Sequence, residues 1–383
     1  MLSKKKSISE LLQSWQYDEE LKQNIIHWHT LDGRRAKYAP FPDELHPSLQ
    51  KALRLRGIDQ LYTHQREAFD KATSGTSFTA ITPTASGKSL CYHLPVLQEI
   101  INDKSSRAIY LFPTKALAQD QKTDLNELIE ATGEEVLSYT YDGDTAPGIR
   151  TKIRKAGHIV MTNPDMLHSG ILPHHTKWVS LFENLKYIVI DELHTYKGVF
   201  GSHVAHVIRR LKRICAFYGA NPIFICTSAT IKNPKELAES LTNEKHELIT
   251  KSGAPVGKKT FIFYNPPIVN PTFGVRRSAV LEVRDLSKRL FEAGIQTIIF
   301  AKSRVRVEML VTYLKSLTFN KIGDESIQGY RGGYLPSERR AIEKGLRDGS
   351  IQMVVSTNAL ELGVDIGQLQ ACIMTGYPGN IAS

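Results

Sequence analysis

Short apolar runs alternate with longer amphipathic stretches from Ser77 onward. The runs are rich in β-branched and aromatic residues and end in polar loops, a pattern typical of parallel strands that helices cover on both faces. Eight strands are expected, with the sequences SFTAI, RAIYLF, HIVMT, KYIVID, PIFICTS, TIIFA, QMVVS and ACIMT. The pattern therefore predicts an α/β fold built on parallel sheets.

The predicted strands form two sets, separated by a stretch without periodicity. Residues 251–275 include KSGAPVGKK and NPPIVNPTFG, in which Pro, Gly and Asn accumulate, so we predict an interdomain linker there. The first domain then spans residues 46–250 and the second spans residues 276–383. Residues 1–45 are expected to form a separate, mostly helical N-terminal extension.

Composition adds size and charge to this prediction. With 383 residues, of which 41% are hydrophobic and 23% charged, the chain is long enough for two hydrophobic cores. Its 49 Lys and Arg residues exceed its 39 Asp and Glu residues, and the formal net charge of +10 favours polyanionic partners such as nucleic acid. Charge alone does not separate DNA from RNA or from an acidic membrane surface.

The sequence contains no segment typical of membrane insertion or secretion. No apolar run approaches the ~20 residues that span a bilayer, so we expect a soluble, cytoplasmic protein with no membrane partner. The cysteines are far apart and are expected to be reduced and mostly buried. His203 and His206 lie one helical turn apart, but no cysteine or carboxylate joins them at ligand spacing, so no metal site is predicted there.

A candidate phosphate-binding loop follows the first predicted strand. Residues 82–89, TPTASGKS, lie between that strand and an apolar segment, the setting that such a loop requires. Lys88 would neutralise the β and γ phosphates of ATP, and the Ser89 hydroxyl would bind Mg²⁺. The loop backbone that would hold the phosphates belongs to Thr84, Ala85, Ser86 and Gly87. Thr82 replaces the first glycine of the common pattern, so a polar turn also explains the loop by itself.

Two adjacent carboxylates, Asp191 and Glu192, end another predicted strand. Adjacent acids are costly unless they share a cation or a proton. Asp191 fits a Mg²⁺ ligand, and Glu192 fits the base that orients and deprotonates an attacking water. An acidic strand end is common, and the assignment gains its force from the phosphate-binding loop.

Further motifs occur in the order found in superfamily 2 helicases, and the chain resembles this family. Gln65, in LYTHQREAF, looks like the glutamine that reads the adenine of ATP. The sequence TSAT is similar to a motif that couples hydrolysis to strand movement, which implies this role for Ser228 and Thr230. STNALELGVDIG resembles the motif in which Gly363 and Asp365 face the nucleotide.

The resemblance also implies a nucleic-acid track made of polar loops on both domains, because a translocase must hold the phosphate backbone that every sequence shares. The expected contact residues are Thr114, Lys115, Thr162, Asn163, Lys302, Ser303, Arg304, Arg331, Gly332 and Thr357. His194 ends the acidic motif and is expected to relay contact toward the Thr230 loop.

Long stretches such as YDGDTAPGIRTKIRKAGHIVMTNPDMLH and YRGGYLPSERRAIEKGLRDG resemble DNA helicases of the MrfA type, bacterial relatives of the RecQ-four-like helicases. The resemblance implies two RecA-like domains of the P-loop NTPase fold. It further implies ATP-dependent 3′→5′ movement on single-stranded or tailed DNA, with Mg²⁺, in repair of mitomycin-type damage. A repair nuclease is a candidate partner, and the expected location is the bacterial cytoplasm, at the nucleoid.

The sequence departs from this family after MTGYPGNIAS. There the family continues into a Gln-x-x-Gly-Arg-x-Gly-Arg segment, whose arginines reach the γ-phosphate, whereas this sequence ends at Ser383. We therefore expect an incomplete second domain, with nucleotide binding retained and hydrolysis impaired.

Two other functions stay open. An RNA helicase of the DExH class would use the same backbone-binding motifs, so the residues do not distinguish the two nucleic acids. A nucleic-acid clamp that binds ATP without hydrolysing it is the second alternative, although Lys88, Asp191 and Glu192 argue against it.

Overall fold

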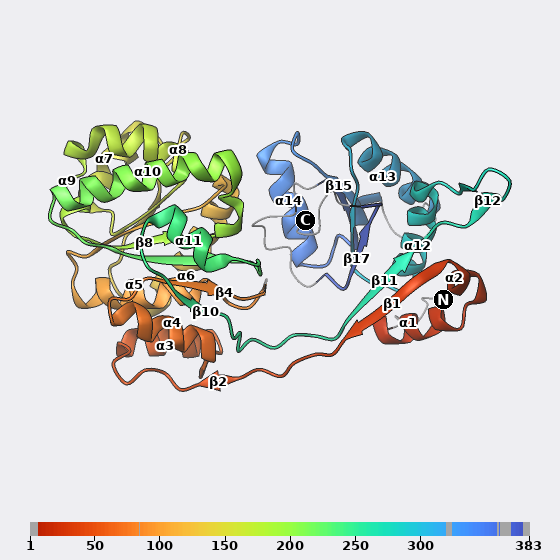
Figure 1. Cartoon of the computed structure of the whole chain (residues 1–383), viewed down its shortest axis with the longest axis horizontal. Helices are drawn as coiled ribbons and strands as arrows, with labels where there is room; N and C mark the ends of the chain where they lie inside the picture. The colour runs from red at the N-terminus through yellow and green to blue at the C-terminus, as the bar shows by residue number, and fades with distance from the viewer. Residues whose placement is uncertain (1–6, 84, 319–323, 358–359, 361–368, 378–383) are drawn as a thin grey trace. The chain divides into compact units, whose positions relative to one another are not determined.

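The computed structural model describes residues 7–83, 85–318, 324–357, 360 and 369–377 (Figure 1). Its internal contacts divide the chain into two units. The first unit is residues 33–257, and the second unit combines residues 1–32 with residues 258–383. Within the described residues, no helix has both the length and the apolar character needed to cross a membrane.

The first unit is built on a seven-stranded sheet in which every neighbouring pair is parallel. The order across the sheet is β10 (Glu247–Ile249), β4 (Phe78–Ile81), β9 (Ile223–Ser228), β8 (Leu185–Ile190), β5 (Arg107–Leu111), β7 (Ile159–Thr162) and β6 (Ser138–Thr140). The five strands predicted for the first set are confirmed as β4, β5, β7, β8 and β9. These strands are almost wholly buried, which explains their continuous apolar runs.

Helices cover both faces of this sheet, and each face has its own apolar core (Figure 1). One layer contains α3 (Pro47–Leu55), α4 (Thr63–Thr73), α5 (Leu90–Asn102) and α6 (Lys115–Thr132). The other contains α7 (Pro147–Ala156), the π-helical turn η1 (Leu167–Ile171), η2 (Leu172–Lys177), α9 (Val179–Glu183), α10 (Gly198–Phe217) and α11 (Pro234–Thr242). The first unit also has short elements outside the main sheet and its two helical layers: β2 (Tyr38–Ala39), β3 (Leu61–Tyr62), α8 (Pro164–Met166) and η3 (Leu193–Thr195).

The second unit has a four-stranded parallel sheet, ordered β15 (Ile327–Tyr330), β16 (Met353–Ser356), β14 (Thr297–Phe300) and β17 (Ala371–Met374). The three strands predicted in this part of the chain are confirmed as β14, β16 and β17. The helices that accompany this sheet are α12 (Ala279–Glu292), α13 (Arg304–Thr318), the short η4 (Asp324–Ser326) and α14 (Pro336–Arg347).

Residues 7–32, the described part of this segment, group with the second unit, whereas the sequence predicted a separate extension over residues 1–45. Helices α1 (Ile8–Gln16) and α2 (Glu19–Asn24) lead into β1 (Ile25–Leu31), which pairs antiparallel with β11 (Lys259–Tyr264). Leu11 belongs to the apolar core of this unit, and Asp18 pairs with Arg289 at 2.5 Å. The predicted linker region also contains β12 (Ile268–Asn270) and β13 (Val275–Arg276).

Candidate functional site

The candidate phosphate-binding loop, residues 82–89, lies between β4 and α5, which is the strand-to-helix position that the sequence predicted. Ala85 and Gly87 both have positive φ, at 58° and 71°, which turns successive peptide N–H groups in a way that favours anion binding. The buried hydroxyls of Thr82 and Ser86 lie 2.6 Å apart and close the loop. Lys88 is half-buried at the start of α5.

Ser89 is half-buried beside Lys88, and its carbonyl accepts from the His93 N–H at 2.9 Å in the first turn of α5. Thr84, another predicted contact in this loop, lies outside the described residues.

Gln65 holds this loop from α4. Its Nε2 donates to the Gly87 carbonyl at 2.9 Å, while its Oε1 accepts from the Tyr62 N–H at 2.9 Å. A Cβ on Gly87 would meet Gln65 Nε2 at 2.6 Å, so the close approach depends on glycine. The amide predicted to read adenine thus also fixes the loop that would hold the phosphates.

His64 is a second anchor that the sequence analysis missed. The fully buried ring has Nε2 3.1 Å from the Ser86 carbonyl, and Nδ1 accepts from the Gly253 N–H at 3.1 Å. Because Nδ1 accepts, Nε2 carries the proton and donates to Ser86. Burial lowers the pKa of His64, which favours this neutral form. Its neighbour Gln65 carried a family motif and His64 did not, so no signal in the sequence singled it out.

Asp191 lies at the carboxyl end of β8 and is 6% exposed. Its Oδ1 accepts hydrogen bonds from the Thr227 hydroxyl and, at 2.8 Å, from the Glu192 N–H. The Asp191 Oδ2 accepts from the hydroxyl of Tyr92, on α5, at 3.5 Å, and together these bonds orient the carboxylate. With the Ser89 hydroxyl, it suits Mg²⁺, which takes one or two protein ligands and completes its shell with phosphate and water.

Glu192 follows with φ at 50° and ψ at 48°, a left-handed conformation that is costly for a residue with a side chain. Burial raises the pKa of its carboxyl and the Asp191 charge raises it further, while the Lys88 ammonium lowers it. A buried carboxyl with a raised pKa is typical of catalytic acids and bases. The Lys88 charge thus partly offsets the effect of burial on this carboxyl.

His194, in η3, has Nδ1 3.2 Å from Glu192 Oε2, although neither atom makes a well-aligned hydrogen bond. Burial and the Lys88 charge lower the pKa of His194. Ser228 is fully buried, and its hydroxyl lacks a hydrogen-bond partner among the described residues, whereas Thr230 is exposed. Within that part of the chain, no hydrogen bond joins His194 to Thr230.

The residues predicted to grip nucleic acid in the first unit differ in exposure. Thr114 is exposed and caps α6, and Lys115 is exposed and pairs with Asp144 at 2.8 Å. Asn163 is half-buried and caps α8 through its side chain. Thr162 is only 2% exposed and its hydroxyl donates to the Tyr141 carbonyl at 2.7 Å, so in this conformation that hydroxyl is not presented to a ligand.

In the second unit, the predicted contacts lie at strand ends. Lys302 and Ser303 are exposed between β14 and α13, and Arg304, also exposed, is the first residue of α13. Arg331 donates to Glu308 at 2.7 Å and stacks over the Tyr334 ring, with exposed Gly332 beside it.

Thr357, half-buried, follows β16 in the second unit. Gly363 and Asp365 lie outside the described residues, so the predicted contacts to the nucleotide from this unit are not described.

Comparison with protein families gives two matches along the chain. Residues 62–237 match the DEAD/DEAH box helicase family, and residues 282–383 match the helicase conserved C-terminal domain. The first match contains both the phosphate-binding loop and the Asp191–Glu192 pair.

Individual relatives agree with the family matches. The chain is 63% identical to the ATP-dependent helicase YprA of Bacillus subtilis, covering 99% of this chain and 50% of that one. It is 37% identical to the ATP-dependent helicase hrq1 of Schizosaccharomyces pombe, and the match covers 98% of this chain and 36% of that one. The crystal structure of the DUF1998 helicase MrfA bound to DNA and AMPPNP is 62% identical, with a TM-score of 0.95 over 98% of this chain and 52% of that one. The chain thus spans about half or less of these relatives.

Proposed function

The chain belongs to the DEAD/DEAH box helicase family and contains two RecA-like units, and from this we propose that it is the motor part of an ATP-dependent DNA helicase. The motor would hydrolyse ATP and use the energy to move along a single strand. One observation carries the proposal: the loop with Lys88 leads into α5, whose Tyr92 hydroxyl donates to Asp191 Oδ2 at 3.5 Å, so the loop and the acidic pair belong to one site.

The residues of the first unit have distinct roles in this reaction. The loop backbone and Lys88 bind the triphosphate, and Gln65 binds the adenine while holding the loop at Gly87. Asp191 and Ser89 hold the Mg²⁺ that accompanies ATP and neutralises phosphate charge. Glu192 orients the attacking water and accepts its proton, a task that suits a carboxyl whose pKa is raised.

DNA is the proposed track because the MrfA structure, 62% identical to this chain, was solved with DNA and AMPPNP. Movement in the 3′→5′ direction, repair of mitomycin-type damage, a repair nuclease as partner and a place at the bacterial nucleoid are further parts of the proposal. They rest on the resemblance to MrfA-type helicases, as does the assignment of contacts to Lys302, Arg304 and Thr357.

A Glu192→Gln variant tests the chemical step. The amide keeps the size of the side chain but cannot accept a proton, so ATP should still bind while hydrolysis falls by roughly 10²–10⁴-fold. Glu130→Gln, an exposed change on α6, is the control and should behave as wild type. Binding is measured with a fluorescent ATP analogue and hydrolysis by phosphate release with single-stranded DNA present. Equal hydrolysis by the Glu192→Gln variant and wild type would exclude Glu192 as the base.

The choice of DNA is tested by competition. A labelled single-stranded DNA is displaced by unlabelled DNA or RNA of the same sequence, with and without the ATP analogue. The proposal requires DNA to compete better and the analogue to change DNA affinity, because coupled sites affect one another reciprocally. Stronger competition by RNA would support the RNA helicase instead.

A further inference from the structure

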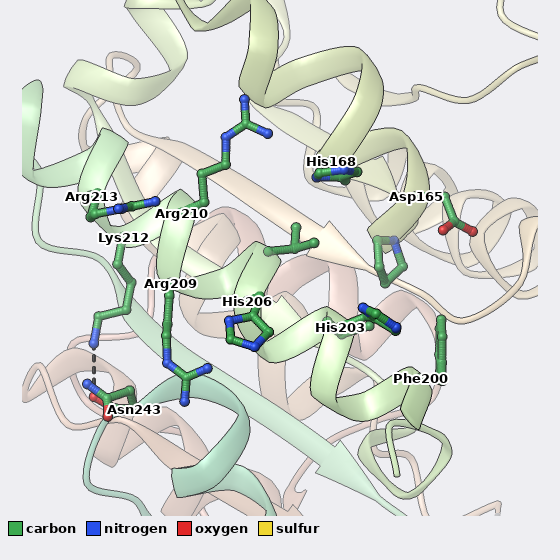
Figure 2. A pocket seen from close by; sticks show the side chains of 13 residues that line it. Asp165, His168, Phe200, His203, His206, Arg209, Arg210, Lys212, Arg213 and Asn243 are labelled. Atoms are coloured by element: carbon green, nitrogen blue, oxygen red, sulfur yellow. Dashed lines mark hydrogen bonds between the residues drawn. The ribbon is translucent and has the colours of Figure 1, made fainter. Parts of the chain in front are cut away.

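A groove with a volume of about 920 Å³ runs along α10 in the first unit (Figure 2). Pro164, Asp165 and His168, from the segment that follows β7, line it together with one side of α10. None of its lining residues belongs to the phosphate-binding loop or to the acidic pair, so the mechanism above does not use it.

The sequence of α10 separates an apolar face from a basic one. Ile208, Leu211 and Cys215 are buried in the core against the sheet. Val204 and Val207 also line the groove. The groove side carries the six basic or titratable side chains His203, His206, Arg209, Arg210, Lys212 and Arg213. From His203 to Arg213 the helix rises by ~15 Å, so these side chains form a stripe rather than a single point of charge.

Most of this positive charge has no carboxylate partner among the described residues of the first unit. Lys212 is neutralised, since its Nζ lies 2.5 Å from Glu244 and also bonds the Asn243 carbonyl. For Arg209, Arg210 and Arg213, the described part of the chain provides no carboxylate within ion-pair distance. Arginines elsewhere in the same unit are paired, as Arg56 is with Asp124 at 2.9 Å.

The end of the groove adds an aromatic surface. Phe200, 43% exposed, lines the groove beside His203 (Figure 2). Its ring stacks on Tyr196, with the ring centroids 5.8 Å apart. Pro164 and Asp165 line the same groove directly after Asn163, a predicted strand contact. A basic groove that follows a backbone and ends in an exposed ring is typical of sites for single-stranded nucleic acid, because any base can stack on the ring.

We propose that the α10 groove binds the phosphate backbone of a single nucleic-acid strand and continues the track beyond the Asn163 loop. The inference rests on the proposed function and extends it by naming a second stretch of strand that the motor holds. Arg209 and Arg213 lie one helical turn apart in this stripe, so their charges can contact more than one phosphate of a single strand. The guanidinium groups of Arg209 and Arg213 bind phosphate without reading sequence, and Phe200 supports the base next to Asn163.

The test is the length dependence of DNA binding by the 383-residue chain. Single strands of about 6 and about 20 nucleotides are compared, since the short one fills the predicted loops and the long one also reaches the groove. The variant is Arg209→Glu with Arg213→Glu, two exposed positions. The control is Lys51→Glu with Arg54→Glu, also exposed and one turn apart, on α3 in the opposite helical layer.

We expect the variant to bind the long strand at least about tenfold more weakly than wild type and the short strand equally well. Its logarithmic salt dependence for the long strand should be shallower by ~1.4, the value for two lost contacts to a single strand. The control should match wild type with both strands. Phe200→Ala should weaken binding of the long strand without changing the salt dependence of that binding, because stacking releases no counterions.

Three results would overturn the inference. If the groove variant and the control lose the same affinity for the long strand, only the net charge of the chain matters. If the groove variant binds the long strand as tightly as wild type, the strand does not use the groove. If the groove variant loses more affinity for a blunt duplex than for the long single strand, the groove binds duplex DNA. Failure of the wild type to bind either strand would instead reject the proposed helicase function itself.

Discussion

The Nε2 atom of His64 lies 3.1 Å from the carbonyl oxygen of Ser86, inside the loop that would hold the phosphates of ATP. The other ring nitrogen accepts from the N–H of Gly253, four residues before the boundary at Gly257 between the two units. One buried imidazole therefore connects the phosphate-binding loop to the segment through which the chain leaves the first unit.

Replacing His64 with Leu should weaken nucleotide binding as well as stability. The change leaves two buried polar groups without partners, at about 1–3 kcal/mol each in the free energy of unfolding. Without the His64 bond to Ser86, a smaller fraction of molecules should have the loop in its binding conformation. We therefore expect the Kd of an ATP analogue to rise roughly tenfold. His46→Leu is the control: it removes the cap of α3 and should cost about 1 kcal/mol without changing the Kd. An unchanged Kd in the His64→Leu variant would leave His64 with a purely structural role.

Gly253 should not tolerate even a methyl group. A Cβ there would lie 2.6 Å from both the Lys37 carbonyl and the Thr63 N–H, and these backbone atoms cannot move independently. We expect Gly253→Ala to lower the free energy of unfolding by about 1–3 kcal/mol. Gly257→Ala, where nothing lies within 4 Å, should be neutral.

The Gly253→Ala and His64→Leu changes should also be non-additive, because both disturb the hydrogen bond between these residues. Urea denaturation of the single and double variants measures this coupling. Strict additivity would show that the bond contributes nothing to the free energy of unfolding.

Thr227 should affect hydrolysis through Asp191. Its hydroxyl donates to Asp191 Oδ1 and is fully buried, so Thr227→Val removes one orienting bond with little change in shape. We expect hydrolysis to need a higher Mg²⁺ concentration, with half-saturation raised roughly tenfold, while nucleotide binding without Mg²⁺ stays the same. Thr79→Val is the matched control, since Thr79 is equally buried but bonds His246. A similar Mg²⁺ dependence in both variants would contradict the role of Thr227.

Acid should destabilise the first unit through His93. Burial lowers the pKa of this histidine from 6.5 to about 4. Its contribution to stability is therefore complete above pH 6.5 and is lost as the pH falls toward 4, because the unfolded chain takes up the proton first. The loss amounts to about 3 kcal/mol at pH 4.

A His93→Phe variant, whose ring can occupy the place beside Tyr92 and Tyr110, should show a smaller fall in stability between pH 7 and pH 4. Urea denaturation at both pH values gives the comparison. If the variant and wild type lose the same free energy of unfolding, then His93 is not the group that titrates.

The apolar pattern predicted the strands with continuous apolar runs, including the half-exposed β17, and missed the short strands with polar positions. All eight predicted strands are present, because continuous runs such as Ile159–Thr162 are long and apolar enough to identify without other information. β6 and β10 are three residues long with polar positions. β15 contains Gly329, whose missing side chain makes room for the Tyr334 hydroxyl. Short edge strands of this kind depend on neighbours that are distant in sequence.

The candidate site was predictable where one motif carries both the position and the chemistry, as in Lys88 or the Asp191–Glu192 pair. His64 and Thr227 could not be found in this way, because their roles arise from partners such as Ser86 and Asp191 that the fold brings close. The burial of Thr162 could not be predicted for the same reason. Its hydroxyl donates to the carbonyl of Tyr141, a residue that follows the adjacent strand β6.

The pairing of β1 with β11 has a consequence for synthesis on the ribosome. Thr30 and Thr260, side by side in this ribbon, are 230 residues apart in the sequence, and the whole first unit is encoded between them. At ~5–20 residues per second, the N-terminal strand waits roughly 10–50 s for its partner. The second unit thus contains one segment translated before the inserted unit and one translated after it, so the inserted unit can acquire its structure before the surrounding one is closed.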